Sequence, residues 1–278
     1  MSHGLDMHDT IVAESDCTEL SFWMAITRRL PRLRGAGALA ELIRSVYLRK
    51  PRPLVRTRIL GNEMILDPTE CIDGGILFYP QIFDHHEISY MRSNLSDGDV
   101  FLDAGAHIGF YTLIAAGLVG KNGRVISIEA NPNTAQKLEQ HVNNNAISNT
   151  TIVQRGLSDK METLRLGTNT GGNIAGSSFL SQSKTFIEIQ CDTLFKTLED
   201  CQISKIRGAK FDIEGYEFRV LNRFLNEAPR TLFPEFMIIE DNPEWAEGSG
   251  GSAMARLESA GYSSIWNSKL NHILMLRP

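Results

Sequence analysis

The sequence predicts an α/β fold: a doubly wound, mostly parallel sheet, an antiparallel hairpin at its carboxyl end, and an amino-terminal cap. From Val100 onward, short apolar runs alternate with helical patterns and turn residues. This alternation indicates parallel strands whose connecting helices cover both faces of the sheet. Two closing strands, near 262–266 and 272–276, are too close in sequence for a crossover helix between them, which predicts the hairpin.

The cap is expected to span residues 1–95 and the main domain residues 96–278. The first part is weakly patterned and interrupted by prolines, whereas strand and helix patterns alternate regularly in the second part. We expect the cap to shape access to the site or to form a dimer contact. Its expected elements are a weak helix over 15–30, a hairpin over 54–66, turns over 68–84 and a helix over 85–95.

The main domain begins with a buried strand over 100–104, followed by a helix that Gly120 stops. After a second strand, Asn131 and Pro132 open the next helix as its N-cap and first helical residue. The remaining expected elements are strands over 150–155, 186–191, 206–213 and 234–239, and helices over 193–200, 216–226 and 252–260.

Composition narrows the class of protein. Of the 278 residues, 42% are hydrophobic and 22% are charged, which excludes a wholly disordered chain. No apolar run reaches the ~20 residues of a membrane span, and the first residues predict no cleaved secretory signal.

Four scattered cysteines without a C-x-x-C pair indicate reduced thiols, so a cytoplasmic location is expected. The net charge of −5 argues against a nucleic-acid partner.

Charge is concentrated in one segment of the cap. Residues 28–58 hold ten basic residues and one acid, Glu41. This segment could dock an acidic carrier protein, a phosphorylated substrate or a membrane surface. Alternatively, it could be a solvent-exposed surface whose positive charge offsets the negative charge of the rest of the chain.

A glycine loop follows the first strand of the main domain. It reads DAGAHIG, with Asp103 at the strand end and Gly105 and Gly109 before the helix. Glycine permits positive φ and close approach of a ligand, and the helix amino terminus offers free N–H groups. The spacing is not the G-x-G-x-x-G of dinucleotide sites. It suits an adenosine cofactor with an amino-acid tail, although a plain glycine turn is the alternative.

Two acids follow the next strands. Glu129 ends the second strand, where a carboxylate can accept hydrogen bonds from ribose hydroxyls. Asp159 follows the third strand within Leu157-Ser158-Asp159 and could bind an adenine amino group. A surface carboxylate and a turn-forming Ser-Asp pair are the alternatives.

The segment KFDIEGYE supplies candidate catalytic acids. Asp212 and Glu214 lie two residues apart at a strand end, so both can point to one side and act as a base, hold an ammonium group or bind a metal. Solvated helix-cap acids are the alternative. His86 is a competing base, since its ordinary pKa is closest to working pH. The other candidates are His85 and His107 as bases, Glu240 as a further metal ligand, and Tyr216 and Trp245 as an aromatic wall.

These segments together resemble the FkbM-type S-adenosylmethionine-dependent methyltransferases. The likeness joins DVFLDAGAHIGFYTLIAA, VISIEANP, LSD and KFDIEGYEFRVL, over about Ile82 to Glu240. The family more often has Asn where this chain has His107. The resemblance implies a Rossmann-like class I fold and methyl transfer to a hydroxyl of a sugar, polyketide or other natural product. It also implies that Asp103, Gly105 and Gly109 hold the methionine part, with His107 beside them, while Glu129 holds the ribose and Asp159 the adenine.

The expected protein is therefore an enzyme that methylates a small or carrier-bound hydroxylated acceptor. A divalent metal is compatible with its acids but no motif demands one, and a homodimer is left open. Two alternatives remain. A nucleotide-dependent oxidoreductase conflicts with the spacing of Gly105 and Gly109. A non-catalytic regulatory module that binds the same cofactor conflicts with the retained acids at 212 and 214.

Overall fold

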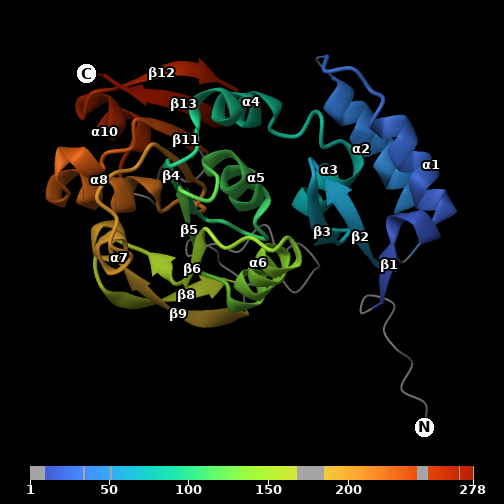
Figure 1. Ribbon diagram of the computed structural model, residues 1–278, viewed down its shortest axis with the longest axis horizontal. Helices are drawn as coiled ribbons and strands as arrows, with labels where there is room; N and C mark the ends of the chain where they lie inside the picture. Colours follow the sequence, from blue (N-terminus) through green and yellow to red (C-terminus); the bar gives the residue numbers. More distant parts are fainter. Residues whose placement is uncertain are drawn as a thin grey trace, which may run out of the picture. The chain divides into compact units, whose positions relative to one another are not determined.

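The computed structural model describes residues 10–33, 35–50, 52–167, 185–242, 250–268 and 270–277 (Figure 1). The chain divides into two compact units, one with the described residues up to Ile88 and one from Ser89 onward. The division falls inside helix α4 (His85–Asn94). The assignment of a cap to 1–95 and of a catalytic domain to 96–278 stays a prediction.

The first unit combines a small sheet with three helices. Strand β2 pairs in parallel with β1 and antiparallel with β3, and the β2–β3 hairpin confirms the expected one. The sequence predicted neither β1 nor α2, and it predicted turns where α3 forms. The elements are β1 (Ile11–Ala13), α1 (Thr18–Thr27), α2 (Ala36–Tyr47), β2 (Leu54–Ile59), β3 (Asn62–Leu66) and α3 (Cys71–Phe78).

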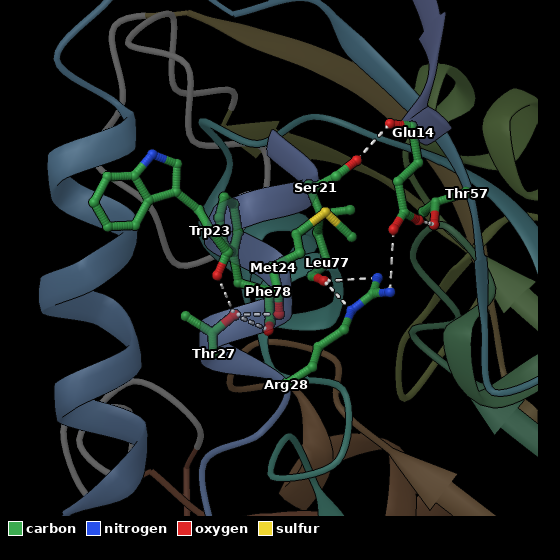
Figure 2. Close-up of polar contacts among 9 residues, drawn as sticks. All are labelled: Glu14, Ser21, Trp23, Met24, Thr27, Arg28, Thr57, Leu77 and Phe78. Atoms are coloured by element: carbon green, nitrogen blue, oxygen red, sulfur yellow. Dashed lines mark hydrogen bonds and ion pairs between the residues drawn. The ribbon is translucent and has the colours of Figure 1, made fainter. Parts of the chain in front are cut away.

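Several arginines of the basic segment hold the first unit together. Arg28 donates to the carbonyl of Leu77 at 3.1 and 3.3 Å (Figure 2). Arg44 is buried and donates to the carbonyls of residues 68, 69 and 70 at 2.7–3.1 Å. Arg52 binds Glu19 through two hydrogen bonds of 2.9 and 3.0 Å. Part of the predicted positive charge is therefore structural.

The second unit is built on a seven-stranded sheet of order β12-β13-β11-β10-β4-β5-β6. Five strands are parallel, and β13 runs antiparallel to both β11 and β12. The predicted fold class, including its closing hairpin, is confirmed. The strands are β4 (Val100–Ala104), β5 (Arg124–Glu129), β6 (Thr150–Gln154), β10 (Gly208–Phe211), β11 (Phe236–Glu240), β12 (Tyr262–Asn267) and β13 (Asn271–Leu276).

Helices pack on this sheet and bury its apolar strands. Helix α5 packs on β4 and β5, α6 packs on β5 and β6, and α8 contacts both α7 and α10. The core between them includes Leu102, Ile126, Phe211 and Phe224. The helices are α5 (Phe110–Val119), α6 (Pro132–Asn144), α7 (Leu194–Asp200), α8 (Glu217–Glu227) and α10 (Ala253–Ser259).

A second, three-stranded sheet of order β7-β9-β8 was not predicted. Its strands are β7 (Gly156–Leu157), β8 (Glu162–Gly167) and β9 (Phe186–Asp192). The sequence indicated a strand over 186–191 and a loop around short strands over 156–185, but not their pairing, because strand pairing across a long connection leaves no local signal.

Within the described residues, no helix is both long and apolar enough to cross a bilayer. All four cysteines are free thiols.

Candidate active site

The glycine loop joins β4 to α5 and requires its two glycines. Gly105 and Gly109 have φ of +79° and +94°. A Cβ at residue 105 would lie 1.8 Å from the main-chain oxygen of Asp212. A Cβ at residue 109 would lie 2.5 Å from Leu138 Cδ1. The loop therefore packs directly on the chain that carries the candidate catalytic acids.

Asp103 lies fully buried at the base of this loop. Its Oδ2 accepts a hydrogen bond of 2.6 Å from Thr112, whose hydroxyl is 2.8 Å from that of Ser127. Its Oδ1 has no hydrogen-bond partner among the described residues. Burial raises the pKa of Asp103, while Lys210 opposes that rise. An unsatisfied buried acceptor is costly, so this oxygen fits a ligand that brings a hydrogen-bond donor.

Glu129 joins the glycine loop to the loop after β5. Its Oε2 accepts from the His107 N–H and its Oε1 from the Asn131 N–H, each at 2.8 Å. Burial raises its pKa to about 7, and the two N–H donors act in the opposite direction. Each carboxylate oxygen keeps a second lone pair. Glu129 can therefore accept from ribose hydroxyls while it holds the two loops together.

His107 has an unusual backbone and an unsatisfied ring. Its φ is +49°, a conformation in which Asn and His are enriched among non-glycine residues. Neither ring nitrogen has a hydrogen-bond partner among the described residues. Burial lowers its pKa to about 4, so the ring is neutral near pH 7 and offers one donor and one acceptor.

Asp159 and Tyr216 lie in the same region of the second unit. Asp159 is half-buried after β7 and accepts a 3.2 Å hydrogen bond from Ser158. Tyr216 is buried before α8, and burial is the main cause that raises its pKa, with Asp159 also contributing. Trp245, the other expected aromatic wall, lies outside the described residues.

A charged cluster forms where β10 and β11 end. Lys210 Nζ is 2.8 Å from Asp212 Oδ2, and Glu240 shares a hydrogen bond with Asp212. Burial alone would raise the pKa of Asp212, but Lys210 and Glu240 outweigh it and hold that pKa below its ordinary value. Burial, followed by the charge of Asp212, raises the pKa of Glu240 to about 9. At neutral pH, Asp212 is thus ionised and Glu240 protonated.

Glu214 lies in the turn beyond this strand rather than on it. Strand β10 ends at Phe211, so strand alternation does not bring Glu214 beside Asp212 as expected. Glu214 instead has φ of +54°. Glu217 accepts from the N–H groups of Ile213 and Gly215, at 2.8 and 2.9 Å, and so fixes the turn. Burial, followed by the charge of Asp212, raises the pKa of Glu214 to about 8.

Sequence reasoning missed Lys210, Glu217 and Thr112 as parts of the site. A lysine within the apolar strand AKF was an available signal for Lys210, because a buried lysine needs a partner. Glu217 and Thr112 carried no signal in the sequence, since each is defined by a contact across a turn or between elements.

The other candidate groups are placed as follows. His86 lies on α4 among the residues of the first unit, with its ring edge-on to His85 at 5.1 Å between centroids. In the described part of the chain, no three or more His, Cys, Asp or Glu side chains are arranged to hold a metal ion.

Solved structures similar to this chain include several methyltransferases. One is an rRNA methylase from Streptococcus thermophilus, which is 14% identical to this chain. The match covers 69% of this chain and 96% of that chain, with a TM-score of 0.40. An O-methyltransferase from Thermotoga maritima has 13% identity, coverage of 85% and 82%, and a TM-score of 0.42. A precorrin-6y C5,15-methyltransferase from Geobacter metallireducens has 13% identity, coverage of 70% and 88%, and a TM-score of 0.42.

One curated protein shares a short segment. The protein-L-isoaspartate O-methyltransferase of Methanococcus aeolicus is 35% identical over 60 residues, which is 22% of this chain. The match spans 28% of that relative's length.

The sheet order, the glycine loop and the acids at the carboxyl ends of the strands define an α/β protein with a candidate ligand site at this edge of its sheet. The methyltransferase FkbM domain matches residues 103–264, more than half of the chain. The chain belongs to this family, and its cofactor is S-adenosylmethionine.

The unsatisfied ring of His107 gives a first prediction. We expect His107→Asn to keep cofactor affinity within about threefold, because an amide also offers a donor and an acceptor and tolerates positive φ. We expect His107→Leu to weaken binding about tenfold or more, because the ligand then loses a partner. Calorimetric titration with S-adenosylhomocysteine measures both variants. Equal affinity of the leucine variant and the parent would show that the ring does not contact the cofactor.

Proposed function

We propose that this protein is an O-methyltransferase that methylates a hydroxyl of a small or carrier-bound acceptor, in the cytoplasm, as part of natural-product biosynthesis. The observation that carries the proposal is Glu214, a half-buried carboxyl with a left-handed backbone, whose pKa is raised to about 8 by burial and by the charge of Asp212. Strained residues cluster at functional sites, and a pKa near working pH suits a general base.

The cofactor supplies an electrophilic methyl group on a sulfonium. The chain has to hold that cofactor, position the acceptor and remove the hydroxyl proton. Asp103 Oδ1, His107 and Glu129 provide hydrogen-bonding groups for the cofactor at the glycine loop. Most of the rate enhancement of such an in-line transfer comes from holding the reactants at attack distance.

Glu214 is the proposed base and Asp212 the group that tunes it. As the hydroxyl oxygen forms its new bond to the methyl carbon, the bond from that carbon to the cofactor sulfur would break to leave S-adenosylhomocysteine, and the hydroxyl proton would go to the Glu214 carboxylate. Asp212 is held by Lys210 and Glu240 and is a weaker base, because these partners keep its pKa low. Its negative charge raises the pKa of Glu214 and so makes Glu214 a better proton acceptor.

The curated relative from Methanococcus aeolicus is, by name, also an O-methyltransferase, which agrees with the proposal. The acceptor itself is proposed only as a class. Sugar, polyketide and other natural-product hydroxyls all fit the proposed chemistry.

The proposal is tested in two stages. Thermal unfolding is first followed with S-adenosylhomocysteine and, in parallel, with NADH. A ligand at 100 times its Kd adds about 2.7 kcal/mol, which should raise the Tm by roughly 5–10 °C. We expect this shift with S-adenosylhomocysteine and none with NADH.

The second stage uses S-adenosylmethionine with a labelled methyl group and a panel of hydroxylated acceptors. Each acceptor is paired with its deoxy and amino analogues. Label in an ether product supports the proposal, whereas label only in the amino analogues would reassign the enzyme to N-methylation. A thermal shift with NADH alone would instead favour the oxidoreductase alternative.

A further inference from the structure

Five large apolar side chains are exposed on α1, α2 and the connection between them. Phe22 and Ile26 lie on α1, Leu33 in the connection, and Leu39 and Leu42 on α2. Their exposed fractions are 59, 37, 69, 47 and 64%, in that order. We call these five residues the apolar face. It holds five of the eleven large apolar side chains exposed in the described part of the chain.

The apolar face is not the side by which these helices join their own unit. Helix α1 buries Leu20, Met24 and Thr27, and Thr27 donates to the carbonyl of Phe78 at the end of α3 (Figure 2). Helix α2 buries Ala40 and other residues at helical spacing, and α1, α2 and α3 contact one another. Since both helices already bury one face, the apolar face lies on their remaining surface.

Positive charge flanks the apolar face. Arg29 follows α1, Arg32 lies in the connection, and Arg49 follows α2; all three are exposed. Arg29 and Arg49 have no ion-pair partner among the described residues. The acids on α1 and α2 themselves are matched, because Glu19 pairs with Arg52 and Glu41 with Arg44. The charge left to act on a partner is therefore positive.

We infer that α1, α2 and their connection form a docking surface for an anionic lipid bilayer. Exposed apolar side chains flanked by arginines suit the headgroup region of a bilayer, where the apolar side chains enter the acyl boundary and the cations meet lipid phosphates. The proposal is independent of methyl transfer.

The test measures sedimentation of the full chain with vesicles. One set contains phosphatidylcholine alone and another contains phosphatidylcholine with 30% phosphatidylglycerol, each in low and high salt. We expect binding to the anionic vesicles, with loss at high salt because screening weakens the arginine contacts. Phe22→Ser with Leu42→Ser should lower the partition coefficient at least tenfold, and Arg29→Gln with Arg49→Gln should lower it on anionic vesicles only.

The matched control is Met161→Ser with Ile265→Ser, two exposed apolar side chains of the second unit. It should bind vesicles as the parent does. The thermal shift with S-adenosylhomocysteine shows that every variant is folded. Equal binding of the parent and the Phe22/Leu42 variant, or no binding to anionic vesicles, would overturn the proposal. So would a dimer, seen by light scattering, that these substitutions abolish while vesicles bind nothing, because a second copy would then cover this face.

Discussion

Gly105→Ala is expected to produce the largest structural effect of any single change in the cofactor loop. The new Cβ would lie 1.8 Å from the main-chain oxygen of Asp212, and the backbone has φ of +79°. Neither problem can be relieved by a side-chain rotation. We expect unfolding to become easier by about 2–4 kcal/mol, with a Tm lower by roughly 5–15 °C. Binding of S-adenosylhomocysteine should weaken more than about tenfold, since the loop must move away from the 212 segment.

Gly117→Ala is the matched control for this change. Gly117 is exposed within α5, and a Cβ there meets no atom within 4 Å. Alanine in a helix interior is favoured over glycine by about 0.5–1 kcal/mol, so the control should be slightly stabilised and bind normally. If the two variants have the same Tm and affinity, the loop does not depend on glycine at residue 105.

Glu214→Gln is expected to produce the largest effect on catalysis. Loss of a general base costs about 10²–10⁴ in kcat, and the affinity for S-adenosylhomocysteine should change little because the side-chain volume is kept. The parent must lose the Glu214 proton before it can act. Its kcat/KM should therefore rise about tenfold per pH unit below pH 8 and level off above about pH 8. The variant should lack this rise.

Two further variants separate a base from a structural carboxyl. Glu139→Gln, at an exposed position on α6, should leave both kcat and the pH profile unchanged. Asp212→Asn removes a charge that raises the pKa of Glu214, so the inflection of its residual activity should move to lower pH. An unchanged pH profile in Glu214→Gln would assign the proton to another group and remove Glu214 from the proposed mechanism.

Local patterns predicted the strands and helices of the second unit well. Buried strands such as β4 and β5 are mostly apolar runs, and Asn131 does cap α6 by accepting from the N–H of Asn133. Helix α3 was missed because Gly74 and Gly75 are poor helix formers, and tertiary contacts decide its structure. Those contacts include the Arg44 side chain, which fills the space beside Gly74.

The sequence could predict only those site residues that lie at the carboxyl ends of strands. Glu129 and Asp212 follow directly from that rule, because parallel strands bring their carboxyl ends to one edge. The bond between Asp212 and Glu240 joins neighbouring strands that are distant in sequence, and the left-handed backbone at Glu214 depends on Glu217. Such features are set by pairing and packing, which no local pattern contains.

The contact between Gly105 and the Asp212 carbonyl also bears on how this enzyme can diversify. The cofactor loop meets the segment that carries the acids through main-chain atoms, so the spacing of the two is independent of the side chains around them. Substitutions at other positions around the site can then change the acceptor that the proposed enzyme takes without changing this spacing. A search for variants with a new acceptor should vary those positions and leave residues 105 and 212 unaltered.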